Sequence, residues 1–179
     1  MNKGLRLSAI ILGFSLFIVL CLPNLSNADD DMLLSIRECV EVNFEAALNE
    51  RRYRDVPHII EQRCLGPETD KCYRKTGGAL LDRDYCVDDE ATAWGVLRRE
   101  FLDLLLSNPK GEATKIALLN ADKAWEDSFF IDCGYVSLRW GRGTLSRSDQ
   151  FECNRNKIAS RAILYRIWLH DLRTRVEGE

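Results

Sequence analysis

Histidine is almost absent from this chain of 179 residues, which contains only His58 and His170. Hydrolases of the Ser-His-Asp or Cys-His type need a histidine that faces the nucleophile. Here one histidine follows Pro57, and the other ends an apolar helical pattern. The sequence also lacks an H-E-x-x-H motif and a glycine-rich phosphate loop with its lysine. We therefore expect that the protein is not an enzyme.

Closely paired metal ligands are missing as well. No C-x2-C spacing occurs in the chain, although structural zinc sites are commonly built from such cysteine pairs together with histidines. Because only two histidines are available, the sequence predicts neither a metal site nor a cofactor.

Carboxylates are the remaining candidates for catalysis, because a pair of them can cleave a glycosidic bond. Five lie close together in the sequence: Asp82, Asp84, Asp88, Asp89 and Glu90. Acidic runs at a helix N-terminus are commonly solvated and interact favourably with the helix dipole. We therefore assign them no catalytic role. The alternative is an enzyme that acts on peptidoglycan through Asp84 or Glu90.

Long apolar runs are confined to the N-terminus. The basic residues Lys3 and Arg6 precede an apolar segment at residues 7–22. Ser26-Asn27-Ala28 then has the small-x-small pattern of a cleavage site. An apolar segment of this length, at about 1.5 Å per residue, is shorter than the roughly 30 Å hydrocarbon core of a bilayer. We predict a signal peptide at residues 1–28, cleaved near Ala28, rather than a retained anchor.

The mature chain is expected to be periplasmic or secreted, with no membrane insertion after signal removal. Cys21 follows Leu20, whereas a lipid-modified cysteine usually follows a small residue, so we expect no lipid anchor. Cleavage removes two of the 25 basic residues and none of the 28 acidic ones, which leaves a formal net charge of −5. An acidic chain is poorly suited to bind nucleic acid but can attract a basic partner.

Six cysteines follow residue 28, and an even number in an exported chain indicates disulfide bonds. Six cysteines allow fifteen pairings, so their spacing is combined with the turns between them. One pair encloses the segment between two predicted helices, and another encloses a segment that must turn at Gly77-Gly78. The predicted pairs are Cys133 with Cys153, Cys72 with Cys86, and Cys39 with Cys64.

Apolar residues recur at helical spacing through most of the mature chain, and no segment shows the strict alternation typical of a strand. The patterns predict helices at residues 32–51, 57–63, 84–107, 112–138 and 148–174. Between Cys64 and Cys86, glycines and a proline predict turns with no more than two helical turns between them. The expected fold is all-α: one domain, residues 29–179, forming a small disulfide-stapled helical bundle with an antiparallel C-terminal helix pair.

Two tryptophans, Trp94 and Trp125, each follow an alanine on a predicted apolar stripe. The stripe of the helix at 112–138 comprises Leu118, Ala121, Trp125, Phe129, Cys133 and Val136. As platforms for stacking a ligand, the two indoles would imply a binding cleft. At helical spacing we interpret them instead as core anchors.

The segment from Asp132 to Cys153 is rich in arginine and aromatic residues, a composition that a single-strand nucleic-acid binder could use. The net acidic charge argues against that function. Its two cysteines are expected to tie a helix pair at the loop end, a closure worth about 3 kcal/mol in the chain-entropy model. We interpret the segment first as a staple and second as a candidate binding loop, with solvated arginines as the alternative. The loop residues are Arg139, Trp140, Arg142 and Arg147.

One series of motifs extends through the C-terminal half: Ala124-Trp125, Cys133, Gly141-x-Gly143, Cys153 and Arg161. On these residues the chain resembles the small exported domain of the LprI-type lysozyme inhibitors. A second series resembles an extension seen in some members: Cys64-Leu65-Gly66, Cys72-Tyr73, Gly77-Gly78, Cys86, Glu90 and Trp94. Together they cover about residues 60–172. Family members carry a glutamine where this chain has Asp122, an aromatic-Arg-Asp run where it has Ser128-Phe129-Phe130, and a threonine where it has Ile158.

The resemblance implies a compact exported domain in which Trp94, Trp125 and Arg161 are structural positions. It also implies a protein partner, namely a lysozyme of the host or the environment. Animal-type lysozymes are strongly basic, and an acidic inhibitor would gain association rate from electrostatic steering. The alternative is a periplasmic envelope interaction or structural module with no activity against lysozyme. The sequence leaves the oligomeric state open.

Overall fold

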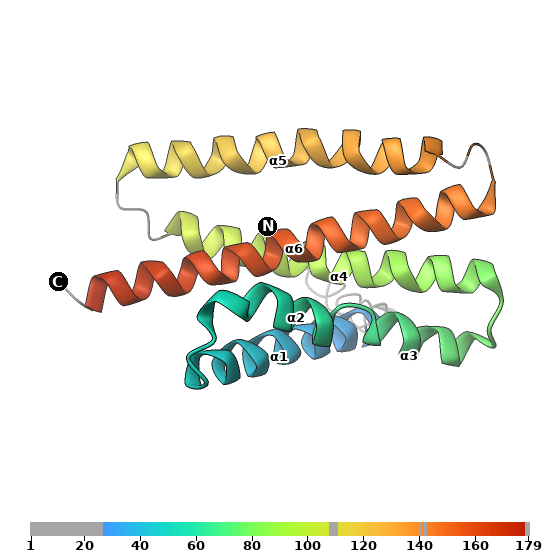
Figure 1. Cartoon of the computed structure of the whole chain (residues 1–179), viewed down its shortest axis with the longest axis horizontal. Coiled ribbons are helices and arrows are strands. Elements are labelled where there is room, and N and C mark those ends of the chain that lie inside the picture. Colours follow the sequence, from blue (N-terminus) through green and yellow to red (C-terminus); the bar gives the residue numbers. More distant parts are fainter. Residues whose placement is uncertain (1–26, 108–110, 140, 142, 178–179) are drawn as a thin grey trace, which may run out of the picture.

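The computed structural model describes residues 27–107, 111–139, 141 and 143–177, and every regular element in these residues is a helix (Figure 1). The elements are α1 (Asn27–Asn49), the 3-10 turn η1 (Tyr53–Asp55), α2 (Val56–Cys64), α3 (Pro67–Thr76), α4 (Leu80–Ser107), α5 (Glu112–Arg139) and α6 (Thr144–Glu177). The expected all-α bundle is therefore confirmed.

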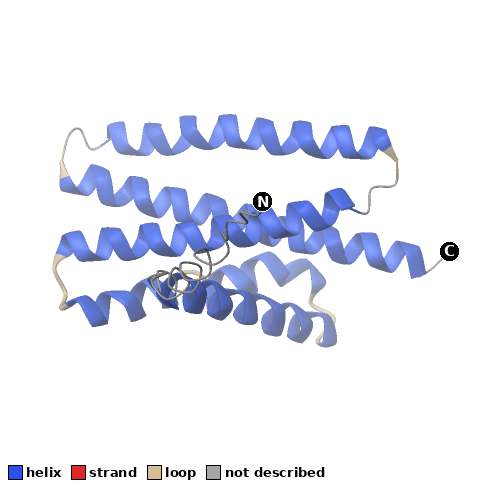
Figure 2. Ribbon diagram, turned by 180° about the vertical axis from the view of Figure 1, so that it is seen from behind, coloured by secondary structure: helices blue, strands red, loops and turns tan. Residues whose placement is uncertain are grey.

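The two central helices are α4 and α6, which pack along each other through the middle of the bundle. On one side α1, α2 and α3 cover them, and on the other side α5 packs against α6 (Figures 1 and 2). The last two long helices run antiparallel, as expected for the C-terminal pair.

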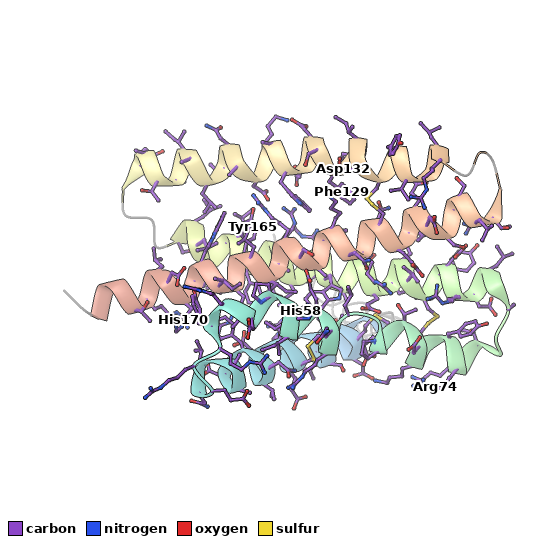
Figure 3. All side chains as sticks on the ribbon, viewed as in Figure 1. His58, Arg74, Phe129, Asp132, Tyr165 and His170 are labelled. Atoms are coloured by element: carbon purple, nitrogen blue, oxygen red, sulfur yellow. A yellow bond between two sulfur atoms is a disulfide. The ribbon has the colours of Figure 1, made fainter. Side chains whose placement is uncertain are left out.

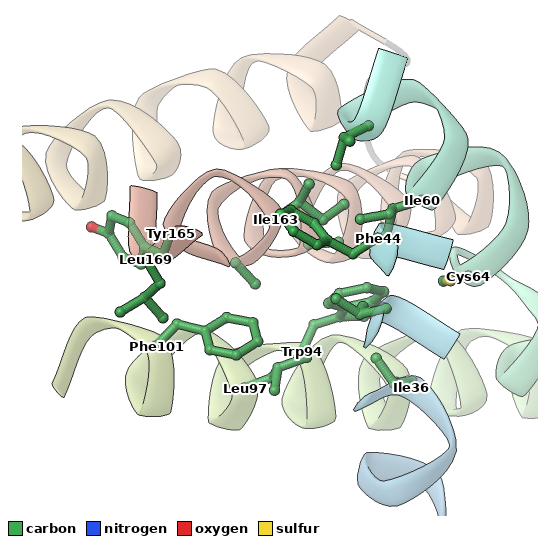
Figure 4. Packing of buried hydrophobic residues seen from close by; sticks show 14 of the residues in the cluster. Ile36, Phe44, Ile60, Cys64, Trp94, Leu97, Phe101, Ile163, Tyr165 and Leu169 are labelled. Atoms are coloured by element: carbon green, nitrogen blue, oxygen red, sulfur yellow. The ribbon is translucent and has the colours of Figure 1, made fainter. Parts of the chain in front are cut away.

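The hydrophobic core lies between α4, α6 and the α1–α2 pair (Figure 4). Helix α4 contributes Trp94, Leu97 and Phe101 at helical spacing, and all three side chains are buried. Facing them are Tyr165 and Leu169 of α6, together with apolar residues of α1 and α2. Burying one such side chain stabilises the fold by about 1.5–3 kcal/mol, so Trp94 is the core anchor that its spacing predicts.

Polar contacts between helices border this core. The guanidinium of Arg166 on α6 donates hydrogen bonds to both carboxylate oxygens of Glu41 on α1, at 2.7–3.0 Å. The same guanidinium lies 3.9 Å from the ring centroid of Phe44. A buried arginine is acceptable here because it has both a carboxylate and an aromatic face as partners.

Three disulfide bonds staple consecutive helices, and their pairs are those that the spacing predicts. Cys39 and Cys64 join α1 to α2, and Cys72 and Cys86 join α3 to α4. The third bond, Cys133 to Cys153, joins α5 to α6. Both of its cysteines lie inside helices rather than at their ends, so the connection between the helices is only residues 140–143.

The prediction of no more than two helical turns between Cys64 and Cys86 is wrong. Helix α3 runs over ten residues, and α4 already begins at Leu80. Gly66 precedes α3 and Gly77 follows it, both in the left-handed region that favours glycine. The glycines therefore mark the two ends of a helix, not a chain of turns. The last helix likewise begins at Thr144, four residues before the expected start.

The predicted apolar stripe of α5 is only partly buried. Of the residues in this helix, Asp122 and Cys133 are buried, whereas Trp125 and Phe129 are half-buried and Ala121 is exposed. The interpretation of Trp125 as a core anchor implied a buried side chain, and it is wrong because this side chain is only half-buried. Helix α5 packs on α6 along one side and leaves most of its surface accessible.

Candidate functional site

The indole of Trp125 lies between two arginines that come from different helices. The guanidinium of Arg98 on α4 is 4.8 Å from the ring centroid, and that of Arg161 on α6 is 5.6 Å from it. Cations over an aromatic face are attracted to its negative π-surface. The three side chains therefore connect α4, α5 and α6.

Arg161 holds the helix pair together through several contacts. Its Nε donates to the hydroxyl of Tyr165 at 2.9 Å, and its Nη2 donates to the carbonyl of Ala121 on α5 at 2.9 Å. The guanidinium also lies 4.8 Å from the ring centroid of Tyr165. The arginine that the sequence resemblance singles out is thus a clamp between α5 and α6.

Asp122 is the polar centre of the same cluster. Its carboxylate is buried and accepts hydrogen bonds from Arg98 Nη1 and from the Tyr165 hydroxyl. Arg98 Nη2 donates to Glu126 at 3.0 Å, one helical turn further along α5. Burial, together with the hydrogen bond to Asp122, raises the pKa of Tyr165 from 10.0 to about 12. The carboxylate of Asp122 is therefore a structural acceptor.

An open groove adjoins this cluster between α4, α5 and α6. It consists of two adjoining hollows of about 270 and 220 Å³. Gly95, Arg99, Phe129 and Ile158 line both hollows. The Phe129 ring stacks on Trp125 with centroids 5.5 Å apart, and Figure 3 shows its side chain between α5 and the other helices.

Arg99 is one of four charged residues that line the groove, together with Arg98, Glu126 and Asp88. The side chain is exposed and forms no ion pair within the described part of the chain. Gly95 leaves the space next to it open, because a Cβ there would lie 3.8 Å from Arg99 Nη1 and 3.9 Å from Ile158 Cγ2. An unneutralised guanidinium beside aromatic walls is suited to bind an apolar group that carries a carboxylate.

Glu90 has a structural role that sequence analysis did not predict. The fully buried carboxylate accepts hydrogen bonds from the backbone N–H groups of Gly66 at 2.7 Å and Thr69 at 2.9 Å. It also accepts from the Thr69 hydroxyl and, at 3.3 Å, from the Trp94 indole. Arg155 Nη1 lies 3.9 Å away. Because α3 has no side-chain cap of its own, Glu90 on α4 serves as its N-terminal cap.

Asp84 is held in a similar way. Its carboxylate is buried, accepts a hydrogen bond from the Ser148 hydroxyl at 2.7 Å, and lies 3.7 Å from Arg147 Nε. Both contacts come from α6, so Asp84 links the start of α4 to the start of α6. The two carboxylates considered for catalysis are therefore engaged in separate interhelix contacts.

The predicted binding loop is not a protruding loop in the described residues. Arg147 lies on α6, where its guanidinium is 5.5 Å from the Tyr85 ring centroid and 5.3 Å from that of Phe151. Arg139 is the last residue of α5. Trp140 and Arg142 lie outside the described residues. The exposed groove, not this segment, is the better-defined candidate for a binding site.

The histidines lie on different helices, His58 on α2 and His170 on α6 (Figure 3). The His170 ring packs against Phe44 and Tyr53, with centroids 5.4 and 5.5 Å apart. In the described ranges, no group of three or more His, Cys, Asp or Glu residues could hold a metal ion. None of the helices in those same ranges has the length and apolar content needed to cross a membrane.

Comparisons of the chain with family models, with curated proteins and with solved structures yield no match.

Proposed function

We propose that the chain is an exported, non-catalytic protein that binds a lysozyme and inhibits it, in the manner of the LprI-type inhibitors that its motifs resemble. The observation that supports a binding function is the open groove between α4 and α5, which combines aromatic walls with the unpaired guanidinium of Arg99. Grooves of this composition orient a ligand by a few polar groups and bind it through apolar area.

The charge of the chain supports a basic partner. With a formal net charge of −5 after removal of residues 1–28, long-range attraction accelerates encounter with a strongly basic lysozyme. The groove itself carries charges of both signs, because Arg98 and Arg99 line it together with Glu126 and Asp88. A lysozyme carries catalytic carboxylates in its cleft, and in the proposed complex Arg99 pairs with an acidic group of the enzyme while acidic surfaces around the groove contact its basic rim.

The carboxylates of Glu90 and Asp84 are already hydrogen-bonded inside the protein, which supports a non-catalytic function. Glu90 accepts four hydrogen bonds and is fully buried, and Asp84 bonds to α6. A general acid or nucleophile must reach the scissile bond directly. Neither carboxylate lies in the groove.

The test is a muramidase assay with the exported, disulfide-bonded protein titrated against several lysozyme types. We expect inhibition at micromolar concentration and binding by calorimetry, both weakened by Arg99→Glu. The matched control is Arg74→Glu, which makes the same charge change on an exposed residue of α3, on the other side of the bundle (Figure 3). No inhibition and no heat of binding with any lysozyme would refute the proposal.

A second candidate function is a periplasmic envelope module with no lysozyme target. The apolar residues exposed along α5 favour it, because large exposed apolar patches are typical of protein interaction surfaces. In this case, pull-downs from envelope fractions recover a dedicated partner, and a charge on the exposed α5 surface, Phe130→Glu, reduces its recovery while Leu34→Glu on α1 does not.

A further inference from the structure

The side of α5 that faces away from the bundle exposes large apolar side chains. Ile131 is 72% exposed and Leu138 is 77% exposed, and Ile116 and Tyr135 are exposed on the same helix. Elsewhere in the described residues, exposed apolar side chains of this size are distributed over several helices. Helix α5 is therefore unusual in carrying a row of them.

A helix with apolar residues on both sides is normally buried on both sides. The inner side of α5 packs against α6 and lines the groove through Trp125 and Phe129. The outer side carries Ile131, Tyr135 and Leu138, which stay exposed. Since burial stabilises by roughly 25 cal/mol per Å² of apolar area, covering this outer side would be favourable.

The spacing of the outer residues is that of a helix–helix seam. Steps of four and three residues alternate along it, which is the repeat of a coiled coil. The seam comprises Ala113, Ala117, Asn120, Ala124, Asp127, Ile131, Gly134 and Leu138. Its N-terminal half carries small side chains, and its C-terminal half carries the two largest ones. This distribution is complementary to its own reverse, because Leu138 of one helix would meet Ala113 of another and Ile131 would meet Asn120, both smaller side chains.

We propose that α5 pairs antiparallel with α5 of a second copy of this chain, about a two-fold axis near residues 125 and 126. In this register residue 120 lies opposite residue 131, and residue 113 lies opposite residue 138. A two-fold dimer uses the same surface on both copies, so one self-complementary helix face is sufficient.

The charges of α5 are consistent with this register. Lys123 and Asp127 form an ion pair within the helix at 3.5 Å. In the antiparallel pair, Lys123 of each copy comes opposite Ser128 of the other, next to Asp127 of that copy, so charges of opposite sign from the two copies lie close together near the axis. Glu112 at the start of one helix comes opposite Arg139 at the end of the other, and the two helix dipoles oppose each other.

The register is tested by cysteine cross-linking of the protein expressed as the full chain and purified after export. Asn120→Cys and Ile131→Cys are prepared separately, mixed and mildly oxidised. We expect a disulfide-linked dimer from the mixture only. Each variant alone places its two new cysteines on opposite sides of the axis, about 16 Å apart along the helices at 1.5 Å per residue. Self-linking of either variant alone would overturn the antiparallel register.

The interface itself is tested by sedimentation of the wild type and of Ile131→Glu. We expect a wild-type dimer and a monomeric variant with unchanged helical circular dichroism, because this side chain is already exposed in the single chain. The matched control is Leu34→Glu on α1. It likewise replaces an exposed aliphatic side chain by a charge, and this variant should remain dimeric. A monomeric wild type, or a dimer that persists in Ile131→Glu, would overturn the proposal without affecting the lysozyme assay.

Discussion

The two flanks of the central α4–α6 pair are built on different principles. On one flank, α1 and α2 bury Ile36, Phe44 and Ile60 against the central helices and add a disulfide. On the other, α5 buries one carboxylate and one cysteine and is held by arginine contacts around Trp125. The first flank is stabilised mainly by apolar burial, and the second by a few directional contacts beside an open groove. The side of the bundle with α1 and α2 therefore contributes most of the apolar burial, whereas the side with α5 carries the accessible groove.

The largest expected difference between the flanks is that between the two tryptophans. Trp94→Ala should lower the free energy of unfolding by about 3–5 kcal/mol, because it opens a cavity in the core and removes a donor to Glu90. Trp125→Ala should cost about 2 kcal/mol or less, since the half-buried indole leaves a site that water can enter. Chemical denaturation of both variants measures the difference. Equal losses would contradict the assignment of different roles to the two flanks.

The carboxylates allow a similar comparison. Glu90→Ala should lower the free energy of unfolding by about 3 kcal/mol, because it leaves buried amide donors and Arg155 without their acceptor. Glu126→Ala on α5 removes one exposed ion pair of Arg98 and should cost less than about 1 kcal/mol. Hydrogen exchange should show that only the first change exposes the N-terminal amides of α3. Protection of those amides in Glu90→Ala would show that the cap is dispensable.

The contact between Tyr165 on α6 and Asp122 on α5 should make the stability of the protein depend on pH in the alkaline range. Because the pKa of Tyr165 rises from 10.0 to about 12 on folding, the neutral phenol is favoured in the folded state. Its contribution to stability is therefore complete below pH 10 and is lost as the pH rises from 10 to 12. Tyr165→Phe should be less stable than wild type at pH 8, by about 1 kcal/mol, and should lose this pH dependence. Denaturant midpoints measured between pH 8 and pH 12 test this prediction. If the midpoint of Tyr165→Phe changed with pH as steeply as that of the wild type, the prediction would be contradicted.

The smallest effect is expected in the floor of the groove. Gly95 lies inside α4, where alanine is favoured over glycine by about 1 kcal/mol, and an added Cβ would meet its neighbours only at ordinary contact distances. Gly95→Ala should therefore stabilise the protein slightly while narrowing the groove. Thermal melting combined with the lysozyme titration tests both parts. Unchanged affinity would argue that the partner does not use the groove.

Local patterns in the sequence were sufficient for the long helices and for the disulfide pairs. Helical spacing placed Trp94 in the core, because α4 packs against α1, α3 and α6 and its apolar stripe is buried among them. The same spacing failed for Trp125, because periodicity identifies the side of a helix but not how closely a neighbour approaches it. The groove at Gly95 arises from that distance, so no residue pattern predicts it.

Helix α3 could not be predicted from its own residues for a related reason. It is short, and its cap comes from Glu90, more than twenty residues further along the chain. The composition of the acidic run at residues 82–90 predicts solvated carboxylates, and this prediction is wrong for Asp84 and Glu90, which are buried. The useful signal was that Glu90 lies one helical turn before Trp94 and therefore shares its buried side. A carboxylate at such a position needs several donors, and the amides of Gly66 and Thr69 supply them.

The three disulfides also have a consequence for the order in which they form. In the predicted mature chain, after loss of Cys21 with residues 1–28, the cysteines are bonded in consecutive pairs: the first with the second, the third with the fourth and the fifth with the sixth. Oxidation in the order of synthesis would therefore produce the native set directly, although six cysteines permit fifteen sets. No bond has to wait for a distant part of the chain, and no mispaired bond has to be exchanged afterwards. The arrangement suits a compartment that supplies an oxidant but little isomerase activity.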